Sequence, residues 1–150
     1  MIALYKVRYT ELIDIMKNAA IEDYITAIYR IETKNGTVRS KNIAEYLEIG
    51  KSSVSEMISK LVNLGLVKHG KYSDLTLTKK GENRARKIVF KHRVIELFLT
   101  KMLKRDKKVV HEEAHKLEHA FTDQSIERIY SILGKPKTGA HGEQIPEVKL

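Results

Sequence analysis

The apolar residues near the start of the chain recur at the spacing of α-helices. One stripe comprises Leu12, Ile13, Ile15 and Met16, and a second comprises Ile21, Tyr24, Ile25, Ile28 and Tyr29. Apolar residues three and four positions apart share one face of a helix, so this segment is expected to be helical. The sequence Lys-Asn-Gly at 34–36 interrupts the pattern and is expected to end it.

Residues 40–65 are typical of two short helices joined by a turn. Ser40 is expected to cap the first helix, whose inward residues are Ile43, Ala44 and Leu47. A turn at 48–50, with its glycine last, precedes a second helix that is expected to begin near Lys51 and to end at Gly65. Its inward residues are Val54, Met57, Ile58, Leu61 and Leu64. Two such helices form a helix-turn-helix.

The following residues predict a β-hairpin and then three helices. Short strands at 66–68 and 75–78 flank a loop at 70–74, and this hairpin would be a wing. Helices are expected at 79–104, 106–121 and 122–133. The predicted fold class is therefore mainly α. A winged helix-turn-helix domain with an N-terminal helical extension occupies 1–80, an all-helical domain occupies 81–134, and an irregular tail occupies 135–150.

The composition and the charge narrow the function. The chain has 150 residues, of which 42% are hydrophobic and 31% charged, as in globular proteins. No apolar run reaches the roughly 18 residues of a membrane span, and the N-terminus lacks a signal-peptide pattern, so we expect a cytoplasmic protein. The net charge is +9, and residues 34–93 alone hold 14 Lys or Arg against 5 Asp or Glu. This bias favours a polyanionic partner, although a solvated basic surface has the same composition.

The outward face of the second helix suits a DNA-reading role. It carries short hydroxyls near the helix start, with a lysine at each end: Lys51, Ser52, Ser53, Ser55, Glu56, Ser59 and Lys60. Residues at the start of a recognition helix approach base edges, and Ser and Lys also bind phosphate. Glu56 is a candidate acceptor for a cytosine amino group, and Arg39 and Lys71 are candidate phosphate contacts. The alternative is a small helical core with a polar outer face.

The sequence HEEAHKLEH at 111–119 predicts a metal site. His115, Glu118 and His119 stand at i, i+3 and i+4, so a helix would place them on one face, with His111 one turn earlier. His92 and Glu96 form another i, i+4 pair. The chain has no cysteine, so any ion is held by imidazole and carboxylate, which suits zinc, manganese or iron(II). The alternative is that the histidines are structural.

Two other function classes remain open at this point. His115, Glu118 and His119 also match the inverted zincin pattern, in which the glutamate is the general base of a hydrolase. Only 31 residues follow His119, which leaves no room for a substrate cleft, so we do not expect an enzyme. A metal-independent DNA-binding protein with incidental histidines is the other alternative.

The chain resembles the diphtheria-toxin-repressor family, which includes iron-dependent repressors and manganese transport regulators. The resemblance covers roughly residues 19–146 and is carried, in order, by AIEDYITAIYRIE, NIAEYLEIGKSSVSEMISKLVNLGLV, LTKKGENRARKIVFKHRVIELFL and HEEAHKLEHAFTDQSIERI. It implies a homodimeric repressor that binds operator DNA of metal-homeostasis genes, with Fe(II) or Mn(II) as co-repressor. Zn(II) or Co(II) is expected to bind in vitro. The all-helical domain over 81–134 would then serve dimerisation and metal binding.

The resemblance also implies two neighbouring metal sites. One would use Asp23 with His115, Glu118 and His119, and the other His92, Glu96 and His111. The ligands mix two patterns. The set His92, Glu96 and His111 matches the ancillary site of iron-type members, but those members have methionine and cysteine at the positions of Asp23 and His115. Manganese-type members share the aspartate but have glutamate at the positions of His115 and Thr26. The chain resembles a two-domain member without the SH3-like domain. The residues before Asn18 are expected to form an extra helix at the dimer surface. That surface is expected to include Leu117, Phe121, Ile126, Ile129 and Ile132, unless these are core.

Overall fold

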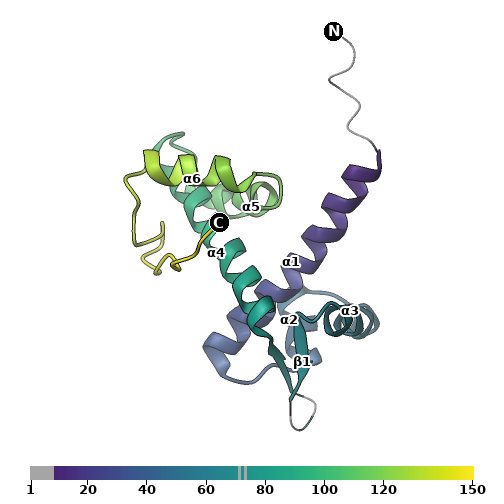
Figure 1. Cartoon of the computed structure of the whole chain (residues 1–150). Coiled ribbons are helices and arrows are strands. Elements are labelled where there is room, and N and C mark those ends of the chain that lie inside the picture. The colour runs from purple at the N-terminus through teal and green to yellow at the C-terminus, as the bar shows by residue number, and fades with distance from the viewer. Residues whose placement is uncertain (1–8, 71, 73) are drawn as a thin grey trace.

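The computed structural model describes residues 9–70, 72 and 74–150, and side chains from Ile13 onward. Its elements are α1 (Tyr9–Asn35), α2 (Ser40–Leu47), α3 (Lys51–Asn63), β1 (Val67–His69), β2 (Leu75–Leu77), α4 (Lys79–Lys101), α5 (Lys107–Glu118) and α6 (Asp123–Ile132). The protein is mainly helical, with one small antiparallel sheet (Figure 1). The predicted order of helices and strands is confirmed. No helix within the described residues is long and apolar enough to span a membrane.

The first core lies between α1, α2, α3 and the wing. Its fully buried side chains include Ile25, Ile28, Ile43, Val54 and Leu61. The two wing strands pair in register, with Val67 opposite Leu77 and His69 opposite Leu75. Since these side chains come from both partners of the helix-turn-helix, the core fixes the position of α3 against α1.

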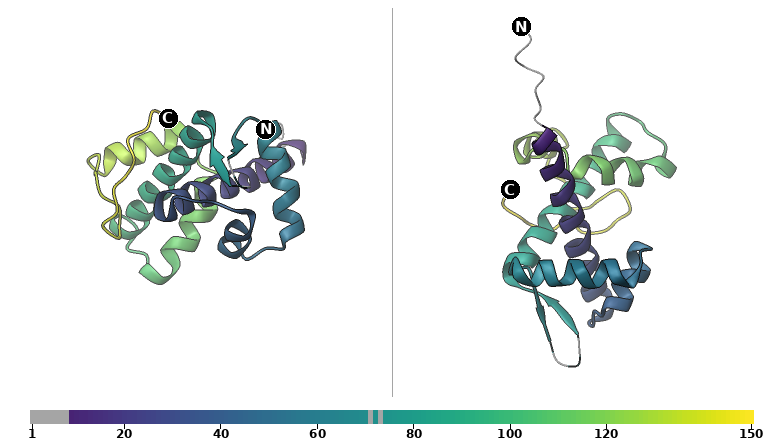
Figure 2. Two further views of the ribbon diagram at one scale, coloured as in Figure 1. Left: turned by 90° about the horizontal axis from the view of Figure 1, so that it is seen from below. Right: turned by 90° about the vertical axis from the view of Figure 1, so that its right-hand side faces the viewer.

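Helix α4 continues from the wing into the second half of the molecule. The Thr78 hydroxyl accepts a hydrogen bond from the Gly81 amide and donates one to the Gly65 carbonyl, which caps α4 at its start. A Cβ on Gly81 would lie 2.0 Å from the Leu66 carbonyl oxygen, so only glycine permits this approach of α4 to the wing. The second part of α4 packs on α5 and α6 around Val94, Ile95 and other buried side chains (Figure 2).

Several details of the sequence prediction were wrong. Leu64 was expected to face inward but is 41% exposed. The described residues before Asn18 continue α1 and do not form a separate helix. Ser40 is the first residue of α2 rather than its cap; Arg39 holds the cap position, and its amide donates to Asn42 Oδ1 at 3.0 Å. Ile15 and Met16 are 47% and 71% exposed, because the start of α1 extends beyond the first core. The long helix α4 ends at Lys101 rather than near 104.

The last helix and the tail form part of the second core. Ile126 and Ile129 are buried there rather than available to a partner, Leu117 and Phe121 pack against them, and Ile132 is exposed. The amphipathic pattern of α6 thus mainly reflects this core. The tail is irregular, as predicted, but its Ile145 is buried in the same cluster. The carbonyl oxygens of the tail accept hydrogen bonds from α4, including one from Arg86 to Glu147 at 3.0 Å.

Candidate metal centre and nucleic-acid interface

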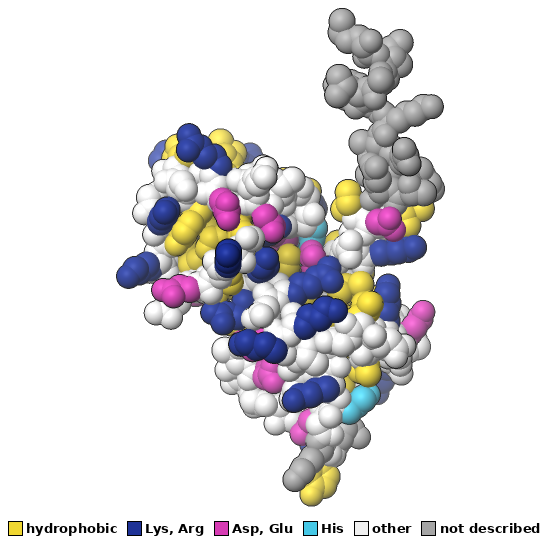
Figure 3. All heavy atoms as spheres, viewed as in Figure 1, with side chains coloured by type: hydrophobic (Ala, Val, Ile, Leu, Met, Phe, Trp, Pro, Cys, Tyr) yellow, Lys and Arg dark blue, Asp and Glu magenta, His cyan; other side chains and the backbone are white. Residues whose placement is uncertain are grey.

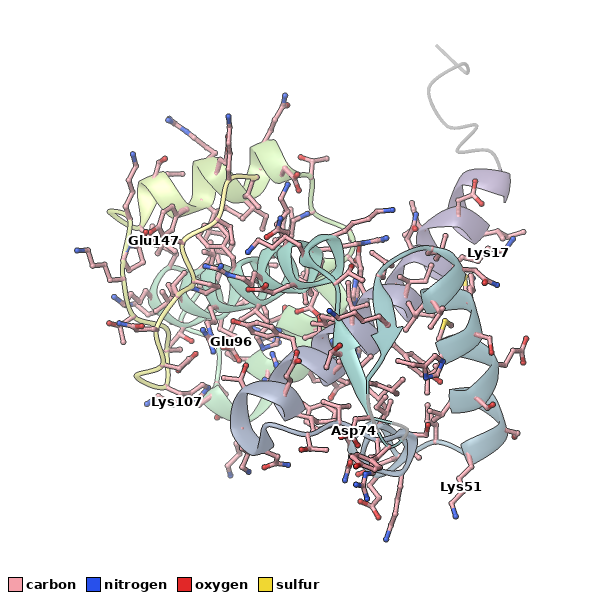
Figure 4. The ribbon with its side chains drawn as sticks, turned by 60° about the horizontal axis from the view of Figure 1, so that its bottom comes forward. Lys17, Lys51, Asp74, Glu96, Lys107 and Glu147 are labelled. Atoms are coloured by element: carbon pink, nitrogen blue, oxygen red, sulfur yellow. The ribbon has the colours of Figure 1, made fainter. Side chains whose placement is uncertain are left out.

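The outward face of α3 is exposed along its whole length. All seven polar residues predicted there are exposed, whereas Val54, Ile58 and Leu61 on the opposite face are buried. Lys51 stands at the start of α3 and its side chain points away from the molecule (Figure 4). The helix begins after Gly50 without a side-chain cap, so its first amides have no side-chain acceptor within the described chain. Such a start is suited to phosphate.

Several of the other basic residues are paired with acidic side chains and so are less available to bind DNA. Arg39 is exposed but lies 3.1 Å from Asp74, and Lys71 lies outside the described residues. On α4, Arg84 pairs with Glu22, and the Lys91 ammonium lies 2.6 Å from Asp123. Lys and Arg side chains are spread over both halves of the face in Figure 3. Part of the positive charge of the chain therefore serves internal contacts.

Four predicted ligands from opposite ends of the sequence meet between α1 and α5. We call Asp23, His115, Glu118 and His119 the α1–α5 cluster. His119 Nε2 lies 3.0 Å from Asp23 Oδ1 and 3.5 Å from Glu118 Oε1. His115 Nδ1 lies 3.1 Å from Glu118 Oε1. Helix α5 ends at Glu118, one residue before His119, but His119 keeps helical backbone angles and so stays on the same face. One ligand atom from each of the four lies within 4.8 Å of the others.

A second cluster is confined to α4 and α5. We call His92, Glu96 and His111 the α4–α5 cluster. Glu96 Oε1 lies 3.1 Å from His92 Nε2 and 3.1 Å from His111 Nδ1, and these two nitrogens are 3.1 Å apart. Glu96 lies among the helices in Figure 4, and only 2% of it is exposed. His141, from the tail, approaches the same oxygen at 3.8 Å.

Glu118 joins the two clusters. Its Oε1 faces His115 and His119, and its Oε2 lies 2.5 Å from His92 Nδ1. Glu118 and His92 are each only 3% exposed. One buried carboxylate therefore contacts both clusters.

The electrostatics of both clusters favour a cation. Burial alone would lower the pKa of His92 and of His119, but the carboxylates hydrogen-bonded to each outweigh it and raise both pKa values to about 9. Burial would raise the pKa of Glu96, yet His92 and His111 lower it to about 2. The buried carboxylates thus stay ionised and need positive charge beside them, which protons on the imidazoles or a metal ion can supply.

The donor spacing fits a small divalent ion. Metal–donor bonds of about 2.1 Å place neighbouring donors of an octahedral ion roughly 3.0 Å apart. The three distances of 3.1 Å in the α4–α5 cluster match this value. In the α1–α5 cluster, the His119–Asp23 distance of 3.0 Å also matches, whereas His119 Nε2 lies 3.5 Å from Glu118 Oε1 and His115 Nε2 lies 3.8 Å from Asp23 Oδ1. The oxygen and nitrogen donors are those preferred by manganese, iron(II) and zinc in sites without sulfur.

Two further residues at the site were not predicted as part of it. Glu22 Oε2 lies 2.8 Å from His119 Nδ1, although its neighbour Asp23 was the expected contact of α1. Thr26 is buried, and its hydroxyl has no hydrogen-bond partner within the described chain. It lines a cavity of about 500 Å³ together with Asp23, His115 and His92, so the clusters are reachable from a hollow between α1 and α5.

Comparisons with known proteins identify the family of the chain. Residues 16–75 match the N-terminal DNA-binding domain of the iron dependent repressors, and residues 78–147 match their metal binding and dimerisation domain. An uncharacterized HTH-type transcriptional regulator of Methanocaldococcus jannaschii is 41% identical over 119 residues, which cover 79% of this chain and 95% of that protein. The HTH-type transcriptional regulator MntR of Lysinibacillus sphaericus is 35% identical over 118 residues, covering 79% of this chain and 84% of MntR.

A solved structure extends the likeness to three dimensions. A manganese-dependent transcriptional repressor in complex with manganese is 38% identical, with a TM-score of 0.78 over 85% of this chain. The match covers 58% of the chain in that structure, so the present sequence spans little more than half its length. Matches to both family domains, in the predicted order, confirm the resemblance seen in the sequence. The chain belongs to the iron dependent repressor family of transcriptional regulators.

Proposed function

We propose that this protein is a metal-dependent transcriptional repressor, in which Fe(II) or Mn(II) acts as co-repressor for binding to operator DNA. One observation carries the proposal. The α1–α5 cluster brings Asp23, on the helix that packs against the helix-turn-helix, within 3.0 Å of His119, 96 residues later in the sequence. The matching family models are named for iron dependent repressors, and one structural relative is a manganese-dependent repressor solved with manganese.

We propose that seven residues hold the ions. Asp23, His115, Glu118 and His119 would hold one, and His92, Glu96 and His111 the other. A bound divalent ion supplies the positive charge that keeps these carboxylates and imidazoles together. Zn(II) and Co(II) are expected to bind in vitro, since the donor set does not exclude them.

The positions of the proposed ligands indicate how metal binding would affect DNA binding. Asp23 lies on α1, whose buried face contacts α2 and so determines where α3 sits. His115 and His119 lie on or beside α5, which packs on the second part of α4. Attraction across this junction fixes α1 relative to α5, and thus one recognition helix relative to that of the partner in a homodimer. The two helices must match successive major grooves, roughly 34 Å apart.

We propose that α3 reads the operator. Lys51, Ser52, Ser53, Ser55, Glu56 and Lys60 would approach the major groove, with Arg39 and Lys71 on phosphates. We also propose the division into a DNA-binding domain over 1–80, a dimerisation and metal-binding domain over 81–134 and a tail over 135–150, supported by the two family matches. The protein would act in the cytoplasm as a regulator and not as an enzyme.

The direct test is DNA binding by fluorescence anisotropy at fixed salt, on an operator candidate from the promoter region of the protein itself. The protein is titrated with EDTA present, and then with Mn(II), Fe(II), Zn(II) or Co(II). Activation by at least one ion supports the proposal and ranks the metals. Equally tight binding in EDTA would instead favour a metal-independent winged-helix protein.

A further inference from the structure

Glu22, a carboxylate outside both proposed ligand sets, contacts the imidazole of His119 in the α1–α5 cluster. We propose that Glu22 is a positioning residue for this cluster. Glu22 binds His119 Nδ1 and so orients the ring with Nε2 toward Asp23 and Glu118. Arg84 in turn holds Glu22 in place. This inference rests on the proposed metal site and assigns it a supporting shell.

The geometry around His119 divides its two ring nitrogens between two tasks. Nδ1 lies 2.8 Å from Glu22 Oε2, and Nε2 lies 3.0 Å from Asp23 Oδ1. A carboxylate only accepts, so Nδ1 carries the hydrogen in this contact. Nε2 faces the proposed ligands Asp23 and Glu118, so it is the nitrogen that would release its hydrogen and bind a metal. An imidazole ligand whose other nitrogen donates to a carboxylate is fixed in both tautomer and orientation.

Arg84 restrains Glu22 from the opposite side. Its Nη2 lies 3.0 Å from Glu22 Oε1, while Glu22 Oε2 faces His119, so the two carboxylate oxygens have separate partners. The side chains of Glu22 and Arg84 are 17% and 33% exposed, which limits competition from water. Arg84 lies on the first part of α4, just after the wing. The chain of contacts therefore runs from Arg84 on α4 through Glu22 on α1 to His119, the residue that follows α5.

The second cluster contains a parallel arrangement. His92 Nδ1 is held by Glu118 Oε2, and His92 Nε2 faces Glu96 and His111. Each cluster thus has one largely buried histidine with one ring nitrogen on a carboxylate and the other toward the candidate ligands. In the α4–α5 cluster that carboxylate is itself a proposed ligand of the neighbouring site, whereas Glu22 is free of that role.

The test measures Mn(II) affinity by calorimetry and the His119 imidazole by long-range ¹H–¹⁵N NMR of the Zn(II)-loaded full chain. The variants are Glu22→Ala, Glu22→Gln and Arg84→Gln. The matched control is Glu82→Gln, because Glu82 also lies beside an arginine, Arg86, on α4. Loss of such a supporting partner weakens metal binding about 10- to 100-fold. We expect that loss at the α1–α5 cluster in E22A, a smaller loss in E22Q, whose amide oxygen still accepts from Nδ1, and none in E82Q.

The NMR signal separates positioning from general stability. In the parent protein His119 should show a slowly exchanging Nδ1 proton, which E22A loses while affinity at the α4–α5 cluster is unchanged. If E22A fails to fold, E22Q and R84Q are compared with the parent, and a weaker α1–α5 cluster with an altered Nδ1 signal supports the inference. Parent affinity and an unchanged His119 signal in the folded Glu22 variants would overturn it. A parent protein that binds neither ion at this cluster would overturn the proposed function instead.

Discussion

The two histidine–carboxylate clusters have similar ligands but connect different parts of the molecule. The α4–α5 cluster joins two helices that already share the second hydrophobic core, including Val94, Val110 and Ala114. The α1–α5 cluster joins α5 to a helix whose buried residues, among them Ile25 and Ile28, belong to the first core. An ion in the first case would strengthen packing that exists without it. An ion in the second would add a direct link between α5 and α1, which otherwise meets the second half of the molecule through α4. We therefore propose that the first cluster gives local support and that the second controls DNA binding.

Removing His119 is the strongest test of the difference between the two clusters. His119→Ala loses the contacts to both Asp23 and Glu22, so metal should no longer tie α5 to α1. We expect metal-dependent tightening of DNA binding to fall by about 100-fold, the scale of a strong allosteric coupling. Anisotropy with saturating Mn(II) measures it. Lys116→Ala, an exposed change on α5, is the control, and full activation of H119A by metal would contradict the account.

Metal removal should lower stability through both clusters. Ions at about 100 times their Kd add roughly 2.7 kcal/mol per site to the free energy of unfolding, if they do not bind the unfolded chain. That corresponds to a rise in Tm of roughly 5–10 °C for a chain of this size. Thermal denaturation by circular dichroism with Mn(II) and then with EDTA checks this. Identical melting curves would show that the clusters hold protons rather than metal.

A change in the α4–α5 cluster should have a smaller effect on DNA. His111→Ala removes an exposed imidazole from Glu96 but leaves Asp23 and His119 in place. We expect one bound ion fewer per chain and a loss of about 10-fold in metal-dependent DNA affinity, transmitted through Glu118. Calorimetry gives the stoichiometry and anisotropy the affinity. A loss equal to that of H119A would mean that the two clusters act as one.

Much of this arrangement could be predicted from sequence, but only where the spacing is local. Helical spacing placed His115, Glu118 and His119 on one face, and His92 with Glu96, as found. The partnership with Asp23 came from the family resemblance, because no local pattern links residues 96 positions apart. The contacts of Glu118 with His92 and of Glu22 with His119 depend on how whole helices pack. Amphipathicity likewise showed that α6 has an apolar face but not that Ile126 and Ile129 face the core of their own chain.

Removing a positive charge from α3 tests the proposed contact with DNA, and we expect a smaller effect than for the changes at the clusters. Lys51→Ala should weaken operator binding several-fold and reduce the salt slope by about 1, if its ammonium neutralises one phosphate. Metal affinity should stay unchanged in the absence of DNA, since Lys51 is exposed and belongs to neither cluster. Anisotropy over a range of salt concentrations measures the slope. An unchanged slope would remove Lys51 from the interface.

The smallest expected effect concerns Thr26, between the clusters. Its buried hydroxyl lacks a partner within the described chain, so Thr26→Val should be neutral or raise the free energy of unfolding by up to about 1 kcal/mol. Urea denaturation with EDTA measures this. Metal affinity should be unchanged, and a marked loss would show that Thr26 binds the ion directly or through water.

The central claim, that metal couples α1 to α5, is tested most directly by hydrogen–deuterium exchange of the DNA-free protein with Mn(II) and with EDTA. We expect Mn(II) to slow amide exchange in α1 around Asp23 as well as in α5 around His115. Protection confined to α4 and α5, with exchange in α1 unchanged, would contradict the account and leave only the local cluster.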